Sequence, residues 1–92
     1  MNVICLKLSS GEELIARQQE TLEDSLTVQD VHILVVQPTP KGMDVSFVPW
    51  AFGAGRAALL INKDHVTATY EPSKELADGF LGRVTGIQIA RA

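Results

Sequence analysis

The side chains suited to acid–base, nucleophilic or metal chemistry are spread along this chain and are not grouped in motifs. His32 and His65 stand far apart, and no Cys–His or Glu–His cluster with ligand spacing accompanies them. The acidic pairs Glu12-Glu13 and Glu23-Asp24 fall in polar turns, where nothing indicates the cleft of an acid–base site. No Ser–His–Asp arrangement can be recognised either. We therefore expect a protein that is not an enzyme and that uses no metal ion or cofactor.

A glycine-rich stretch at residues 51–57 superficially resembles a phosphate-binding loop, because Arg56 follows two glycines. A nucleotide-binding fingerprint needs a preceding strand, a longer glycine pattern and a following helix, and these are missing. We interpret the stretch as a flexible excursion. Trp50 and Phe52 flank it, and two roles are open for this aromatic pair: stacking on nucleic-acid bases, or packing in the core or an interface.

Length and charge restrict the class of protein. The 92 residues carry a net charge of −3, and 46% of them are hydrophobic, which predicts one globular domain with a modest core. The pI of about 5.2 argues against non-specific binding of duplex DNA. Cys5 is the single cysteine and is interpreted as a small buried hydrophobe. Because no leader or membrane span is visible, we expect a cytoplasmic protein without a membrane partner.

The longest β-type run, residues 26–37, shows how the sheet is organised. Leu26 and Val28 lie on one face of an ideal strand, whereas Val31, Ile33 and Val35 lie on the other. The period of a strand is two, so one extra residue is needed to bring both sets to the same side. We therefore predict a β-bulge or sharp bend at residues 29–30.

The remaining elements follow from alternation, turn residues and one helical spacing. Leu76 and Phe80 are four residues apart, after a proline and the possible cap Ser73, which predicts a short helix at residues 73–81 and then an extended tail. We therefore expect residues 71–92 to form a helix and tail. They follow residues 1–70, where a long strand that bends midway can serve both walls of a small, curled barrel. The other predicted strands span residues 3–8, 13–19, 43–50, 58–61 and 66–70.

Two stretches of this pattern resemble a known family. VICLKLSSGEELIARQQ, followed by DSLTVQDV, resembles the first motif of Sm and Sm-like (LSm) proteins, and LLINKDHVTATY resembles the second. The positions of the first motif are occupied by Gly11, Leu14, Ala16, Leu26 and Val28. The whole chain, with its PTPKGM and VTATYEPSKEL stretches, is closer still to small Sm-like proteins of marine cyanophages.

The resemblance implies a mainly β fold: a strongly bent, five-stranded antiparallel small barrel of the SH3-like type, here with a short C-terminal helix. It also implies a homo-oligomeric ring in which the fourth strand of one subunit pairs with the fifth strand of the next. Such pairing would satisfy the open edges of a small sheet. We favour five or six subunits.

The resemblance also places candidate RNA-binding residues in two loops. Asp24 and Ser25 stand where RNA-binding members carry an asparagine, and Asn62 and Lys63 stand where they carry Arg-Gly. Each position has an alternative role: Asn62 as a turn former, Lys63 as a solvated lysine, Asp24 and Ser25 as loop residues. A carboxylate facing phosphates would be repulsive, which sets this chain apart from those members.

Two functional hypotheses follow. The first is a non-enzymatic Sm-like ring that binds single-stranded RNA or serves as a scaffold in RNA processing or regulation. The second is a structural or regulatory adaptor that contacts only proteins, with Trp50, Phe52 and the C-terminal tail on its surface. If the chain is phage-encoded, either protein would act in the host cytoplasm. No small-molecule substrate is inferred.

Overall fold

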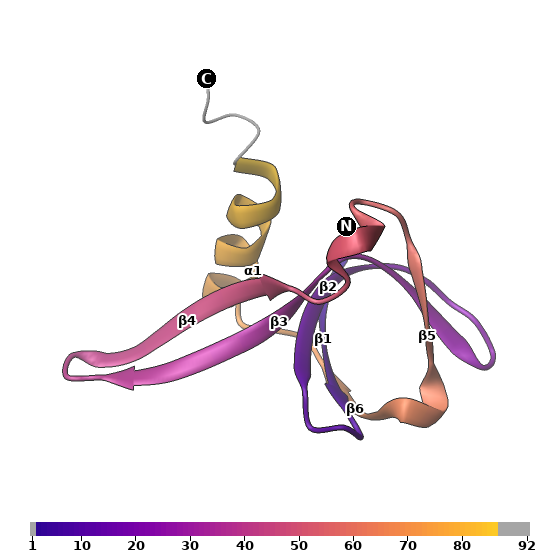
Figure 1. Cartoon of the computed structure of the whole chain (residues 1–92), viewed down its shortest axis with the longest axis horizontal. Coiled ribbons are helices and arrows are strands. Elements are labelled where there is room, and N and C mark those ends of the chain that lie inside the picture. The colour runs from indigo at the N-terminus through magenta and orange to yellow at the C-terminus, as the bar shows by residue number, and fades with distance from the viewer. Residues whose placement is uncertain (1, 87–92) are drawn as a thin grey trace.

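The computed structural model describes residues 2–86 and is dominated by β-structure, with one short helix near the C-terminal end (Figure 1). The extended tail predicted after the helix falls largely outside these residues. Within residues 2–86, no helix has the length and apolar character needed to span a bilayer. The strands are β1 (Asn2–Leu8), β2 (Glu13–Thr21), β3 (Ser25–Thr39), β4 (Gly42–Pro49), β5 (Leu59–Asn62) and β6 (Val66–Tyr70). The helical elements are 3₁₀ turns at Phe52–Ala54 and Lys63–His65, the α-helix α1 (Lys74–Leu81) and a π-helical turn at Gly82–Gly86.

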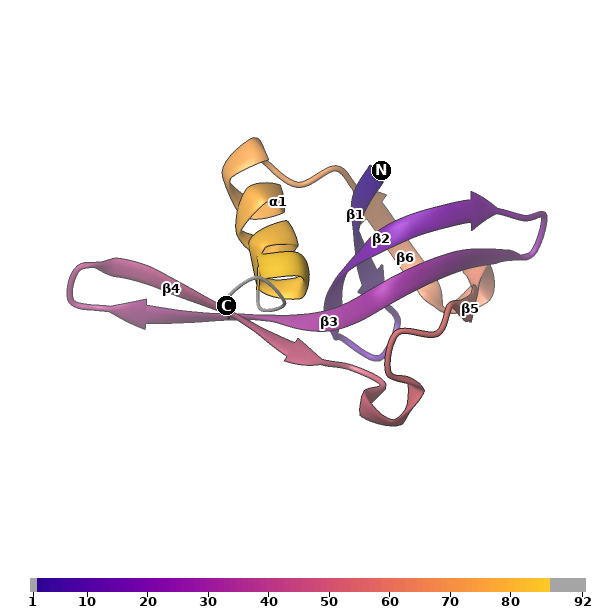
Figure 2. The same ribbon diagram turned by 90° about the horizontal axis from the view of Figure 1, so that it is seen from above.

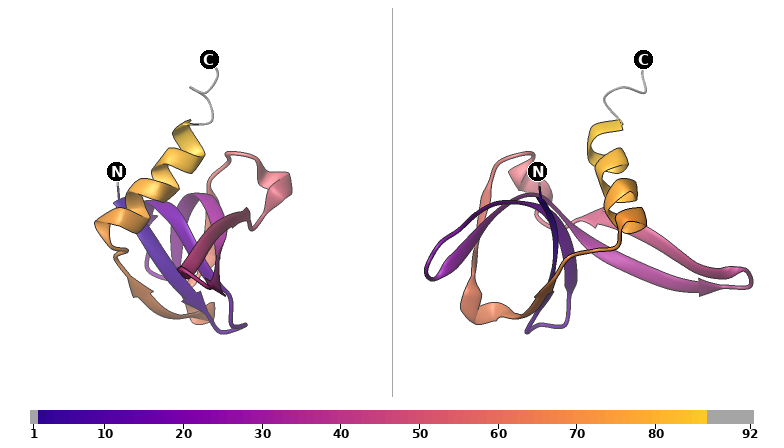
Figure 3. Two further views of the ribbon diagram at one scale, coloured as in Figure 1. Left: turned by 90° about the vertical axis from the view of Figure 1, so that its left-hand side faces the viewer. Right: turned by 180° about the vertical axis from the view of Figure 1, so that it is seen from behind.

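The long strand β3 is the centre of a single antiparallel sheet. One of its edges pairs with β2, while its other edge pairs with β5 near its start and with β4 along its second half. The strand order is β4-β3-β2-β1-β6, with β5 beside β3. The sheet curls so that β5 and β6 approach each other across its hollow side (Figure 1; Figure 3). No ladder joins these two strands in the described part of the chain, so the sheet is not closed.

The predicted bulge in β3 is confirmed. The register between β2 and β3 shifts where a single residue, Ala16, lies opposite both Asp30 and Val31. Asp30 has a φ of 56°, a left-handed conformation that aspartate tolerates better than most residues. The extra residue brings Val31 back to the core face that already holds Leu26 and Val28.

The inner face of the curled sheet encloses the larger of two apolar clusters. Side chains of β1, β2, β3 and β5 fill it, and they follow the alternation read from the sequence. Its buried members are Leu6, Leu8, Leu14, Ala16, Leu26, Val28, Val31 and Ile61.

The outer face of the sheet is covered by α1, which forms the second cluster (Figure 2). Phe80 is fully buried against Cys5 and Ile15. Its ring makes edge contacts with His32 and Phe47, at centroid distances of 5.6 and 5.9 Å. The predicted helix is confirmed. It begins after Ser73, whose hydroxyl accepts a hydrogen bond from the Leu76 amide.

The structure has six strands where the resemblance predicted five. The alternation pattern predicted separate strands at residues 43–50 and 58–61, and the structure confirms both as β4 and β5, which use the same edge of β3 but are separated opposite the bulge. The β3–β4 ladder ends at the His32–Pro49 pair beside the bulge, where Pro49 has no amide hydrogen to donate. Residues 50–58 bridge the interruption.

A two-stranded ribbon of β3 and β4 projects from the curled sheet (Figure 1; Figure 2). Its cross-strand pairs Val36–Val45 and Pro38–Met43 put apolar side chains on one face. Helix α1 covers only the base of this face, at Phe47. Beyond it, the ribbon stays exposed.

The burial of Phe80 predicts that replacing Phe80 by alanine destabilises the fold by about 3–5 kcal/mol, the usual cost of emptying a site of this size. Urea unfolding followed by circular dichroism measures the loss. Met43→Ala, at an exposed apolar position on the ribbon, is the control and should cost less than about 0.5 kcal/mol. Equal losses in the two variants would show that α1 is not held by Phe80.

Candidate functional site

The four candidate RNA-binding residues lie together at one end of the curled sheet. Ser25 is the ladder partner of Asn62 at the start of the β3–β5 pairing. The Lys63 amide donates a 2.9 Å hydrogen bond to the carbonyl oxygen of Asp24. The β2–β3 turn and the β5–β6 turn are therefore one structural unit, although about 37 residues separate them in sequence.

The side chains of this unit differ in their freedom to bind a ligand. The Asn62 side-chain oxygen accepts a 2.9 Å hydrogen bond from the Asp64 amide and caps the 3₁₀ turn, which is the turn-forming role considered above. Its amide nitrogen makes no hydrogen bond with the described residues and can still donate. Asp24 is exposed, and Ser25 is partly covered.

Lys63 borders a groove of about 450 Å³ on the hollow side of the sheet. The groove separates the ends of β2 and β3 from β6, where no ladder closes the sheet. Its wall is uncharged apart from Lys63 and mixes apolar residues with polar ones, Gln18 and Thr21 from β2 and Thr67 and Thr69 from β6. Lysine at the rim of a neutral groove suits a ligand with a negatively charged backbone.

A second polar cluster, which the sequence reasoning missed, surrounds the bulge. The Asp30 carboxylate, with 6% of its side chain exposed, accepts hydrogen bonds at Oδ2 from Arg17, at 3.1 Å, and from Arg56, at 3.0 Å. A buried carboxylate needs such partners, because desolvation of the charge is otherwise costly. The bulge was a signal for an unusual residue at this position, but nothing in the sequence paired it with arginines 13 and 26 residues away.

Arg56 also changes the interpretation of residues 51–57. This stretch is not a free excursion: it contains a 3₁₀ turn, and the Arg56 carbonyl oxygen accepts a 2.6 Å hydrogen bond from Gln29. Trp50 packs against the inner cluster and donates from Nε1 to Glu12 at 3.1 Å. Phe52 differs, since it is 85% exposed. The packing role is therefore confirmed for Trp50 alone.

A third group lies near the free edge of β6. The hydroxyl of Tyr70 donates a hydrogen bond to the carboxylate of Glu13, and burial together with this bond raises the pKa of Tyr70. Burial is also the largest cause that raises the pKa of the Cys5 thiol, so the thiol stays protonated near neutral pH. Cys5 thus has the character of a buried hydrophobe, as predicted, and not of a nucleophile.

Comparison with known proteins supplies no family assignment, because no protein-family model and no curated protein matches this sequence.

The cluster around Asp30 predicts that Asp30→Asn destabilises the fold by about 2–3 kcal/mol, less than the full cost of breaking a buried pair because Arg56 is half exposed. Asparagine keeps the tolerance for positive φ and removes only the charge. Urea unfolding measures the change, with Asp44→Asn on the exposed ribbon as the control. A loss no larger than that of the control would mean that the two arginines do not stabilise the bulge.

Proposed function

We propose that this chain is a non-enzymatic Sm-like protein that assembles into a homo-oligomeric ring and binds single-stranded RNA. The strands form a small barrel in this proposal, completed between subunits and not within one chain. If the chain is phage-encoded, the ring acts in the host cytoplasm. The observation that carries the proposal is the pair of free strand edges at the two ends of the curled sheet.

The order of the strands supports assembly. Strand β5 pairs only with β3, and strand β6 pairs only with β1, so each has an edge without a ladder in residues 2–86. The two strands follow each other through one tight 3₁₀ turn, which matches the second motif of the family that the sequence resembles. An unpaired edge is a template for another strand. Pairing β5 of one copy with β6 of the next joins different surfaces, and a closed ring satisfies every such edge.

Exposed apolar surface on β5 agrees with this contact. Leu60 is 68% exposed in the single chain, although it lies in the middle of a four-residue strand. A 92-residue chain buries a smaller share of its surface than a larger domain does, so burial between copies is a natural supplement. Five or six subunits are the favoured number.

RNA binding is proposed at the unit formed by Asp24, Ser25, Asn62 and Lys63. Lys63 would contact a phosphate, while the free amide of Asn62 would donate to a base edge. The ring would repeat this unit once per subunit, so that several weak contacts add up along one RNA strand. The Asp24 carboxylate and the net charge of −3 oppose tight binding, which makes the proposed affinity strongly dependent on salt.

The alternative function is a structural or regulatory protein–protein adaptor without RNA binding. It is favoured by the exposed apolar face of the ribbon, where Met43, Val36 and Val45 are left uncovered by α1. Exposed apolar patches on small proteins often mark interaction sites.

Ring assembly predicts a native mass of about 50–60 kDa, five or six times the chain mass of 10.0 kDa. Leu60→Lys places a charge at the proposed contact and should shift the protein towards monomers in light scattering. Met43→Lys, at a similarly exposed position of 65% on the ribbon, should leave the mass unchanged. A wild-type monomer at micromolar concentration would remove the ring and, with it, the family assignment.

RNA binding predicts a saturable, salt-dependent interaction with short U-rich or A-rich RNA in fluorescence anisotropy. Lys63→Gln should weaken it by about three- to tenfold and reduce the slope of log affinity against log salt. Lys41→Gln at the tip of the ribbon is the charge-matched control. If no binding is found at low salt while the ring persists, the adaptor function replaces RNA binding.

A further inference from the structure

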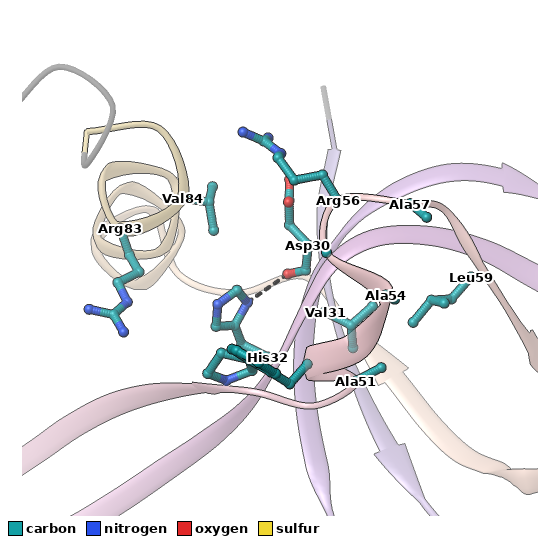
Figure 4. A pocket seen from close by; sticks show the side chains of 13 residues that line it. Asp30, Val31, His32, Ala51, Ala54, Arg56, Ala57, Leu59, Arg83 and Val84 are labelled. Carbon is teal, nitrogen blue, oxygen red and sulfur yellow. Dashed lines mark hydrogen bonds and ion pairs between the residues drawn. The ribbon is translucent and has the colours of Figure 1, made fainter.

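A cavity of about 340 Å³ opens between the bulge of β3, residues 51–57 and the turn that follows α1 (Figure 4). Most of its lining is apolar, including Val31, Ala51, Ala54, Ala57, Leu59 and Val84. A few polar side chains stand at its border, which is the usual composition of a site for a small ligand. The cavity shares no lining residue with the groove beside Lys63.

The arginines of the described chain are concentrated around this cavity. All three arginines of residues 2–86 belong to it or to the cluster behind it: Arg56 and Arg83 line the cavity, and Arg17 shares the carboxylate of Asp30 with Arg56. Asp30 is the single acidic side chain among the lining residues. In a chain of net charge −3, the cavity is thus locally cationic, which favours an anionic ligand.

The two lining arginines have different roles. Arg56 is held by Asp30 on the side of residues 51–57, whereas Arg83 extends from the turn after α1 (Figure 4). Arg83 is exposed and makes no hydrogen bond or ion pair with any residue in the described part of the chain. A guanidinium of this kind can offer paired N–H donors to phosphate oxygens.

Two rings at the cavity suit a flat partner. The Nδ1 of His32 lies 2.8 Å from the Asp30 carbonyl oxygen, and a carbonyl can only accept, so Nδ1 carries the hydrogen. In the neutral ring, Nε2 is then an acceptor. Phe52, also a lining residue, is 85% exposed, although the segment that carries it is fixed by hydrogen bonds on both sides. Exposed aromatic rings stack on nucleobases with little dependence on sequence.

We propose that this cavity binds a nucleoside monophosphate unit, either a free nucleotide or one nucleotide of a single strand. Arg83 binds the phosphate, with the charge of Arg56 in support. The base lies against the apolar lining, where Phe52 stacks on it and His32 Nε2 accepts a hydrogen bond from its exocyclic amine. This site is distinct from the proposed RNA contact at Lys63.

The test is titration of the intact protein with AMP, with adenosine and with an adenine hexanucleotide, followed by amide chemical shifts at low salt. We expect saturable AMP binding with shifts at residues 51–57 and 82–86, and binding weaker for adenosine by at least about tenfold. Arg83→Gln and Phe52→Ala should each weaken AMP binding by about tenfold. Lys74→Gln, an equal charge change on the exposed first turn of α1, should leave it within about twofold.

The source of the nucleotide follows from the same titration. AMP binding identifies a free nucleotide as a sufficient ligand, while hexanucleotide binding alone, lost in Arg83→Gln but kept in Lys63→Gln, identifies a strand. Both results support the site. If neither AMP nor the hexanucleotide binds saturably, the proposed site is wrong. It is also wrong if Arg83→Gln and Lys74→Gln weaken binding equally. If hexanucleotide binding is lost in Lys63→Gln and unchanged in Arg83→Gln, this site is wrong and the proposed RNA contact at Lys63 is supported.

Discussion

The bulge at Asp30 is the constraint on which the rest of this structure depends. Two residues of β3 oppose one residue of β2, and Asp30 takes a left-handed conformation to allow it. The strand before the bulge closes over the inner cluster and pairs with β5, while the strand after it pairs with β4 and leaves the curled sheet. The carboxylate at the bulge joins Arg17 of β2 to Arg56 of the bridging segment. Asp30 thus stabilises the bend of β3 and also anchors residues 50–58, the segment that connects β4 to β5 past the bend.

The same bend leaves the sheet open. A strand of fifteen residues is shared between two partners on one edge, so the short β5 is left with an outer edge that no strand of residues 2–86 covers. Strand β6, at the other end of the sheet, likewise has a free outer edge in residues 2–86. A bare sheet edge presents unpaired N–H and C=O groups that another strand can pair. These free edges, and not a recognisable catalytic group, are the main support for the proposed assembly.

Much of this fold follows from local sequence patterns. Alternation placed the strands, the shift of phase in residues 26–37 located the bulge, and the spacing of Leu76 and Phe80 gave the buried side of α1. These features are predictable because each depends on residues a few positions apart.

Features that depend on distant residues were not predicted. The pairing of Asp30 with Arg17 and Arg56 joins residues far apart in sequence, and the fixed conformation of residues 51–57 results from Asp30 and Gln29. The sequence around residues 51–57 does not indicate that Asp30 or Gln29 contacts this segment. The loop residues at positions 24–25 and 62–63 are the exception, because the resemblance to Sm-like proteins selected both loops as candidate RNA-binding sites. The structure brings them together, while their role in binding stays a prediction.

Hydrogen exchange at the backbone amides of β5 and β6 tests the central claim most directly. Ring assembly predicts that amides facing away from β3 and β1 are protected in the native protein as strongly as the amides inside the sheet. It also predicts that this protection is lost on dilution, together with the native mass. If the outward-facing amides of both strands exchange as fast as those of exposed turns at every concentration, the edges are bare and the chain does not assemble through them.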